Sequence, residues 1–154
     1  MLQDDLSGTF DSDGAKSVAF LSALNGLLKQ TPFELAYRAL NELLLAVACF
    51  KPVDDMQLQA VWDDFLMTKV LPRIEGDADK LRRKEDGPEG DDLLVQLQKL
   101  LELQLPVIWH VQRPDLLREY KNNQDPLMVE TRSKKKLAWM QQRLDSANFT
   151  AFWP

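Results

Sequence analysis

Cysteine and histidine are almost absent from this chain of 154 residues, which has one of each, Cys49 and His110. A single cysteine excludes a disulfide bond within the chain. Cys49 follows Ala46, Val47 and Ala48, so we expect it to be a small buried side chain rather than a reactive thiolate. His110 has no cysteine or carboxylate near it at metal-ligand spacing, which argues against a zinc site.

Long apolar runs are also missing. The longest, residues 43–50, is far shorter than the 18 or so residues that a membrane-spanning helix needs. The first residues have no basic region followed by an apolar run, so we expect no signal peptide and a cytoplasmic protein. The net charge of −5 argues against a dedicated nucleic-acid binder, which usually carries a basic surface. Neither GxxxxGK[ST] nor GxGxxG occurs, which excludes these two nucleotide-binding motifs.

Apolar residues are plentiful, at 45% of the chain, and they recur at spacings of three and four. This pattern predicts one all-α domain, a bundle of about five to six helices. We expect a flexible segment over 1–13, a helical domain over 14–154 and a mobile loop at 82–92, which has no core-forming side chains. Residues 106–128 give mixed signals. The expected helices cover residues 15–30, 32–50, 54–70, 91–105 and 133–146.

The helix expected at 32–50 is apolar over most of its circumference, so we predict that it is the most buried helix. The aromatic tail at 149–154 is expected to pack back on the domain or onto a partner. The basic cluster at 132–136 is interpreted as a solvated face rather than a nucleic-acid site. No nucleophile, base and orienting group come together, so no catalytic residue is predicted.

Three pairs of adjacent aspartates suggest a hydrolase or magnesium site at first sight: Asp54/Asp55, Asp63/Asp64 and Asp91/Asp92. Neighbouring side chains on a helix point about 100° apart, so the members of a pair are not expected to converge. We attribute the pairs to helix capping and solvation, and we predict no metal site.

Arg38 stands out because it lies within the most apolar predicted helix. An arginine tolerates burial poorly unless it is paired. Glu34 and Glu42 lie four residues away on either side and are possible partners. A ligand at the edge of the domain is the other possible partner, and the residues themselves leave both possibilities open.

Three ordered blocks of this sequence resemble the C-terminal helical region of McrB-like AAA+ NTPases, the motor subunits of methylcytosine-dependent restriction systems. Block one, PFELAYRALNE at 32–42, matches a phenylalanine followed by Tyr-Arg and Asn-Glu. Block two, MTKVLPRIEG at 67–76 with Lys80-Leu81, matches K-[IV]-L-P-[KR]-[IL]-x-G and a following Lys-Leu. Block three joins SKKKLAWM at 133–140, Arg143-Leu144 and FTAF at 149–152, which are similar to the family's ending.

The resemblance implies an AAA+ lid, which packs over the nucleotide of a separate core domain and takes part in ring assembly in a restriction or defence system. The implied cofactor is GTP or ATP with magnesium, held by the parent motor rather than by this chain. Arg38 is the residue that matches a sensor-2 arginine by position. The implied partners are an AAA+ core domain, neighbouring ring subunits and a nuclease subunit. A stand-alone helical interaction module, or an inhibitor of such a ring, is the alternative.

Overall fold

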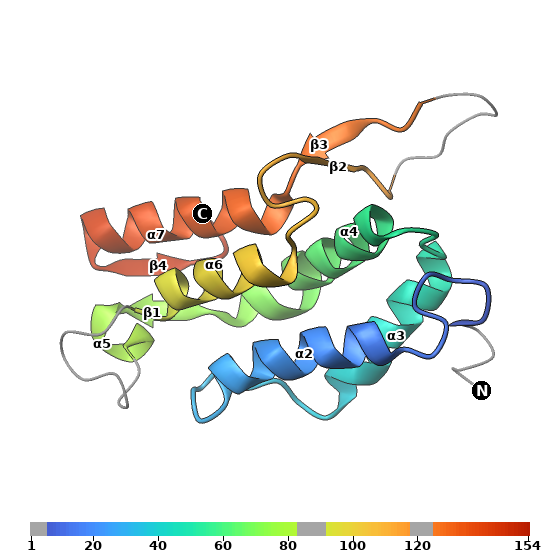
Figure 1. Ribbon diagram of the computed structural model, residues 1–154. Helices are drawn as coiled ribbons and strands as arrows, with labels where there is room; N and C mark the ends of the chain where they lie inside the picture. The colour runs from blue at the N-terminus through green and yellow to red at the C-terminus, as the bar shows by residue number, and fades with distance from the viewer. Residues whose placement is uncertain (1–5, 83–91, 118–124) are drawn as a thin grey trace.

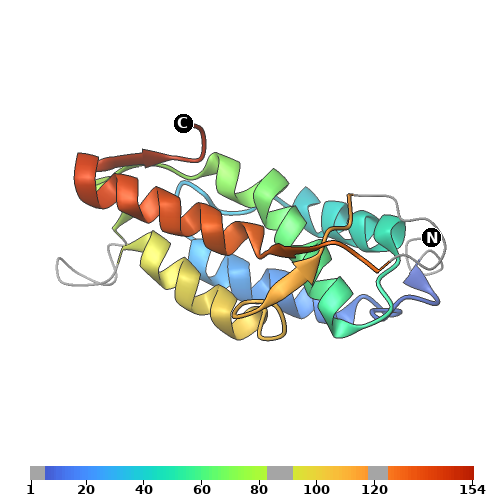
Figure 2. The ribbon, with the colours of Figure 1, turned by 90° about the horizontal axis from the view of Figure 1, so that it is seen from above.

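The computed structural model describes residues 6–82, 92–117 and 125–154 (Figure 1). The helices of the described residues are α2 (Ala15–Leu28), α3 (Arg38–Phe50), α4 (Asp55–Phe65), α5 (Ala78–Leu81), α6 (Leu93–Gln104) and α7 (Arg132–Ala147). Helix α6 lies between α2 and α7, and seen from above α6 and α7 run side by side (Figure 2). Helix α4 packs against both α3 and α7. None of these helices is long and apolar enough to cross a membrane.

The prediction of an all-α fold is wrong, because the described chain also contains two small antiparallel sheets. β1 (Glu75–Asp77) pairs with β4 (Phe149–Ala151), with Gly76 opposite Thr150. β2 (Gln112–Pro114) pairs with β3 (Met128–Glu130), with Arg113 opposite Val129. Each strand has three residues, too few for an alternating apolar pattern to show in the sequence. The pairing of β1 with β4 depends on tertiary proximity rather than on local sequence.

Helix α4, not the helix that contains residues 38–50, lies at the centre of the core. Seven of its eleven residues are buried, whereas α3 buries only Ala39, Leu43 and Val47. Trp62 of α4 stacks on Phe20 of α2 with ring centroids 4.5 Å apart, and its Nε1 donates to Ser17 Oγ at 3.0 Å. The prediction that 32–50 forms the most buried helix is therefore wrong, because α3 has neighbours on one side only.

The helical segment that begins with α4 changes its backbone hydrogen-bonding pattern twice before it ends. A π-helical turn, η1 (Leu66–Val70), follows α4 directly, and a 3-10 turn, η2 (Leu71–Arg73), follows that. Pro72 lies in the 3-10 turn, as expected for a residue that cannot donate within an α-helix. After these turns the chain enters β1, at the end of the domain opposite the start of α4.

Residues 6–13 pack against the helices rather than extending away from them. Leu6 belongs to the core, and the Asp11 side chain is fully buried. Asp11 accepts hydrogen bonds from the backbone amides of Lys16 and Ser17, both at 2.9 Å, which satisfies donors in the first turn of α2. The expected mobile loop at 82–92 lies mostly outside the described residues.

The C-terminal tail packs back on the domain, as expected from its aromatic content. Strand β4 contacts α7 and β1, and Phe152 is buried. Trp153 remains exposed, with its ring edge-on to Phe152 at 4.8 Å between centroids.

Candidate functional site

Arg38 is the first residue of α3, not a residue in the middle of a longer helix. The segment before Arg38 forms a turn rather than a helix, because Thr31 Oγ1 accepts a hydrogen bond from the amide of Phe33 at 3.1 Å. The amide of Leu35 then donates to Asn25 Oδ1 of α2 at 3.0 Å. Residues 32–37 therefore have hydrogen-bond partners that compete with those of an α-helix. The prediction that this helix begins at residue 32 is wrong.

The side chain of Arg38 is exposed, and within the described residues it forms no ion pair. The carboxylate of Glu42, one turn later, instead meets Lys69 Nζ at 3.7 Å. The proposed pairing of Arg38 with Glu34 or Glu42 is thus not found. Tyr37 before it is almost fully exposed and gives α3 no side-chain cap. The amide of Ala39 in the first turn of α3 already donates to the backbone oxygen of Ala36 at 3.0 Å. The exposed guanidinium of Arg38 is therefore the group at the start of α3 that suits an anion.

Two further cations lie near the start of α3. Lys69 of η1 reaches Glu42, and Arg73 Nη2 of η2 donates to the backbone oxygen of Glu34 at 3.3 Å. A hollow of about 410 Å³ opens between α2 and the start of α3, and Arg38 is not one of the residues that line it. It is lined by Leu21, Asn25, Leu35, Ala36, Tyr37, Leu40 and Asn41. We call the exposed set Arg38, Lys69 and Arg73 the Arg38 surface.

The three sequence blocks of the McrB-like resemblance come together in this fold. Strand β1, which ends block two, pairs with β4 of block three. The contact of Arg73 with Glu34 joins blocks one and two, as does the ammonium of Lys80, 5.6 Å from the ring centroid of Phe33. Lys136 Nζ donates to the backbone oxygen of Phe152 at 2.8 Å within block three.

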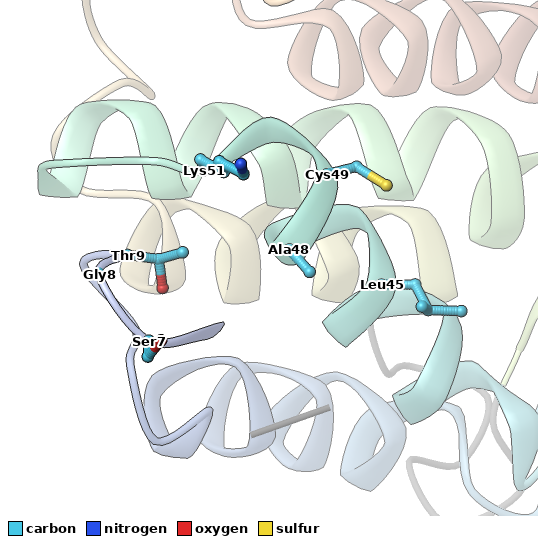
Figure 3. A pocket seen from close by; sticks show the side chains of 7 residues that line it. All are labelled: Ser7, Gly8, Thr9, Leu45, Ala48, Cys49 and Lys51. Carbon is cyan, nitrogen blue, oxygen red and sulfur yellow. The ribbon is translucent and has the colours of Figure 1, made fainter. Parts of the chain in front are cut away.

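Cys49 lies at the surface, so its predicted burial is wrong. It lines a second hollow of about 660 Å³ at the C-terminal end of α3. Figure 3 shows Leu45, Ala48 and Cys49 on α3, with Ser7, Gly8 and Thr9 of the N-terminal loop facing the helix. The apolar neighbours of Cys49 in sequence are spread around α3, and only one face of that helix is covered.

A buried cluster of charges joins α4, β2 and α7, and sequence reasoning missed it. Arg113 Nη1 donates to Asp63 Oδ2 at 3.0 Å and to Asp64 Oδ1 at 2.7 Å, and its Nη2 donates to Asp64 Oδ2 at 3.0 Å. The side chains of Arg113 and Asp63 are fully buried. The two adjacent aspartates therefore converge on one guanidinium, which contradicts the expectation that they point apart into solvent.

Asp63 also caps α7 from a distance of almost seventy residues in sequence. Its carboxylate accepts from the backbone amides of Arg132 and Ser133, each at 2.8 Å. Arg132 in turn binds Asp64 at 2.9 Å and Asp115 at 3.0 Å. The hydrogen bond from Arg132 lowers the pKa of Asp115, although burial acts in the opposite direction. All these charges have partners within the fold, so the role of the cluster is to hold α4, β2 and α7 together.

The basic cluster at 132–136 is largely occupied by the chain itself. Lys134 Nζ donates to the backbone oxygen of Trp109 at 2.8 Å. Lys136 Nζ lies 4.3 Å from the ring centroid of Trp139, and burial together with nearby Arg143 lowers the pKa of Lys136. Lys135 is exposed, as predicted, but the cluster as a whole is not a solvated face.

Histidine and metal-type ligands do not gather into a site within the described residues. His110 is exposed, and its Nε2 lies 2.8 Å from Glu102 Oε1. No group of three or more histidine, cysteine, aspartate or glutamate side chains in this part of the chain is placed to hold a metal ion. The Arg38 surface and the hollows along α3 are among the features of the described residues that are open to a ligand or partner. Further hollows of about 510 Å³ between α6 and α7 and of about 330 Å³ beside β2 and β3 are open as well.

Comparison with known proteins gives one family. No curated protein and no solved structure matches the chain. A family model described as Domain of unknown function (DUF8727) matches residues 4–149, which is nearly the whole chain. The chain therefore belongs to the DUF8727 family.

Proposed function

We propose that this chain is the C-terminal lid of an McrB-like AAA+ NTPase motor, acting in the cytoplasm as part of a restriction or defence system. In this role it packs over the GTP or ATP of a core domain that lies outside these residues. It performs no hydrolysis itself, and it links the nucleotide to assembly of the ring. Neighbouring subunits and a nuclease subunit are the further partners.

The observation that supports this proposal best is the meeting of the three blocks in space. Blocks one and two contact each other through Arg73 and Glu34, and blocks two and three through β1 and β4. More than a hundred residues separate block one from the end of block three. Residues that resemble one family in order, and that also contact one another across the fold, are more specific than any single block.

Arg38 has the position and the freedom that contact with a nucleotide requires. It is exposed, it opens a helix of thirteen residues, and no carboxylate of the described chain neutralises it. A guanidinium at a helix N-terminus suits the γ-phosphate because the arginine fork and the helix dipole both favour negative charge. In the proposed motor Arg38 binds this phosphate while the core domain carries out the chemistry.

The test is to add the purified chain to an McrB-like core domain that lacks its lid and to measure GTP and ATP hydrolysis with magnesium. We expect the chain to raise the rate. Arg38→Ala should lose about 10- to 100-fold of the stimulated rate, the range expected for a hydrogen bond to a charged group. Lys135→Ala, which removes an exposed cation on α7, is the matched control and should behave as the original chain.

The same assay separates the alternative function. An interaction module that inhibits the ring would bind the core domain and suppress its rate, with little dependence on Arg38. No binding and no change in rate would contradict the lid proposal. Hydrolysis by the purified chain alone would contradict it as well.

A further inference from the structure

We propose that residues 149–154 form a strap that opens and closes against α7 and β1 while the helices stay folded. In the closed state the strap lies along α7 and its strand β4 pairs with β1 (Figure 2). In the open state β1 has no partner strand among the described residues, because this sheet has two strands only. A strand edge uncovered in this way is able to pair with another strand. The inference is independent of the proposed function.

Few side chains of the strap are buried. Thr150 and Phe152 are covered, whereas Phe149 is 46% exposed and Trp153 is 65% exposed. A segment with few buried apolar side chains opens at a lower free energy than the core does. Helix α7, by contrast, is anchored in the core by three residues: Leu137, Met140 and Leu144.

Asn148 is the hinge between α7 and the strap. Helix α7 ends at Ala147, and Asn148 has a φ of +56°, in the left-handed region that asparagine adopts more readily than most residues. The amide of Asn148 donates to the backbone oxygen of Leu144 at 2.9 Å. This hydrogen bond completes the last turn of α7 before the strap begins. The strap can therefore open without breaking it.

Two side chains of α7 bind the backbone of the strap. Lys136 Nζ donates to the backbone oxygen of Phe152 at 2.8 Å, and Arg143 Nη1 donates to that of Trp153 at 2.9 Å. The pairing of β4 with β1 covers three residues. Water replaces hydrogen bonds of this kind when a surface segment opens, so each one stabilises the closed state only modestly.

Closing the strap also has a cost. Thr150 Oγ1 is buried and has no hydrogen-bond partner among the described residues. A buried hydroxyl without a partner is unfavourable, because it has lost its hydrogen bonds to water. Burial together with the nearby charge of Arg143 lowers the pKa of Lys136, so the closed arrangement disfavours the charge on this lysine. The closed state is thus held by a small difference between opposing contributions.

The start of α7 is a reference site that should not open locally. Ser133 is fully buried, and its amide donates to Asp63 Oδ1 at 2.8 Å in the buried charge cluster. The hydroxyl oxygen of Ser133, like that of Thr150, has no hydrogen-bond partner within the described ranges. Cysteine is close in size to serine and threonine. Either hydroxyl can therefore be exchanged for a thiol without the loss of a hydrogen bond.

The experiment measures how fast a maleimide labels a thiol at each of these two positions in the full chain. Cys49→Ala removes the exposed native thiol, and Thr150→Cys or Ser133→Cys is then added. A buried thiol reacts only while its site is open. We expect the thiol of Thr150→Cys to react about a hundredfold faster than that of Ser133→Cys. Low urea should barely change the first rate and should steeply raise the second, because opening the strap exposes little surface and global unfolding exposes much.

Phe152 is the largest buried side chain of the strap, so its removal should favour the open state. Phe152→Ala should raise the labelling rate of Thr150→Cys by at least about tenfold. Trp153→Ala is the matched control, because that ring is mostly exposed, and its effect should be much smaller. Equal effects of the two substitutions would contradict the role of Phe152 as the anchor of a closed strap.

Two results would overturn the inference. Equal labelling rates at the two positions, with the same urea dependence, would show that the strap opens only with the whole domain. A thiol of Thr150→Cys that reacts as fast as it does in the urea-unfolded chain would show that the strap is not closed. Hydrogen exchange of the unaltered chain tests the same inference without a new cysteine. The amides of residues 149–153 should exchange faster than those of residues 137–144, and equal protection would contradict a separately opening strap.

Discussion

Arg113 shows how much one residue can organise in a domain of this size. Its guanidinium is fully buried and contacts Asp63, Asp64 and the backbone oxygen of Pro114. Desolvating these charges is costly, and the cost is offset because nearly every donor has an acceptor. The cluster fixes α4, β2 and the start of α7 relative to one another, which is a role in specificity of the fold rather than in chemistry.

Replacing Arg113 should therefore be severe. We expect Arg113→Met to lower the free energy of unfolding by about 3–5 kcal/mol, because it leaves the buried carboxylate of Asp63 and the partly buried one of Asp64 short of their partner. The control is Lys69→Met, which removes an ion pair that is largely exposed and should cost about 0–1 kcal/mol. Urea unfolding followed by circular dichroism measures both. Equal losses of unfolding free energy in the two variants would show that the cluster does not hold these elements together.

The lowered pKa of Asp115 gives a prediction for acid. Because its folded pKa lies below the usual 3.8, the ionised carboxylate stabilises the fold above that value, and this contribution is lost as the pH falls through the folded pKa. The free energy of unfolding should fall more steeply between about pH 5 and pH 3 in the original chain than in Asp115→Asn. Equal slopes, or an NMR titration of Asp115 with a midpoint at or above the usual value, would contradict this.

At the scale of elements, the pairing of β1 with β4 joins the end of the helical segment from α4 to η2 to the C-terminal tail. Gly76 makes this pairing possible because its φ is +143°, a backbone conformation that residues other than glycine rarely adopt. A Cβ at this position would also lie 2.6 Å from Lys80 Cδ and 3.0 Å from Lys80 Cβ. The glycine of the second block thus has a conformational reason to be there.

Gly76→Ala should lower the free energy of unfolding by about 1–3 kcal/mol because of this backbone strain. Gly26→Ala is the matched control, since Gly26 lies within α2 and a Cβ there meets nothing within 4 Å. That variant should gain about 0.4–1 kcal/mol through reduced freedom of the unfolded chain. Thermal unfolding of the two variants tests the pair, and a neutral Gly76→Ala would count against a tight β1–β4 junction.

At the scale of the whole molecule, the buried charge cluster and the surface open to a ligand are separated. The buried charges join α4, β2 and α7, whereas Arg38 and the two hollows along α3 are open to the surface. The proposal of a nucleotide-facing arginine concerns this open part of α3. A domain arranged in this way has a rigid interior and presents one face to a partner.

The sequence by itself determined most helices, and it indicated that the aromatic tail is covered without deciding between the domain and a partner. The helix predicted over 15–30 is found at Ala15–Leu28, and the one predicted over 133–146 at Arg132–Ala147. Apolar spacing and capping residues are local signals, and they were sufficient to place these two helices, although not the start of α3. The cap on α4 is an example, because Asp54 Oδ1 accepts from the amide of Gln57 at 2.8 Å.

Only the tertiary structure decided the strand pairs, the burial of α4 in place of α3, and the partners of the charged residues. Asp63 and Arg113 are fifty residues apart, and the amides that Asp63 caps are farther still. Burial and ion pairing depend on which elements become neighbours, and a periodic pattern states only that a face is apolar. For the same reason, the apolar sequence of α3 indicated burial, and only the fold showed that one face of this helix is covered.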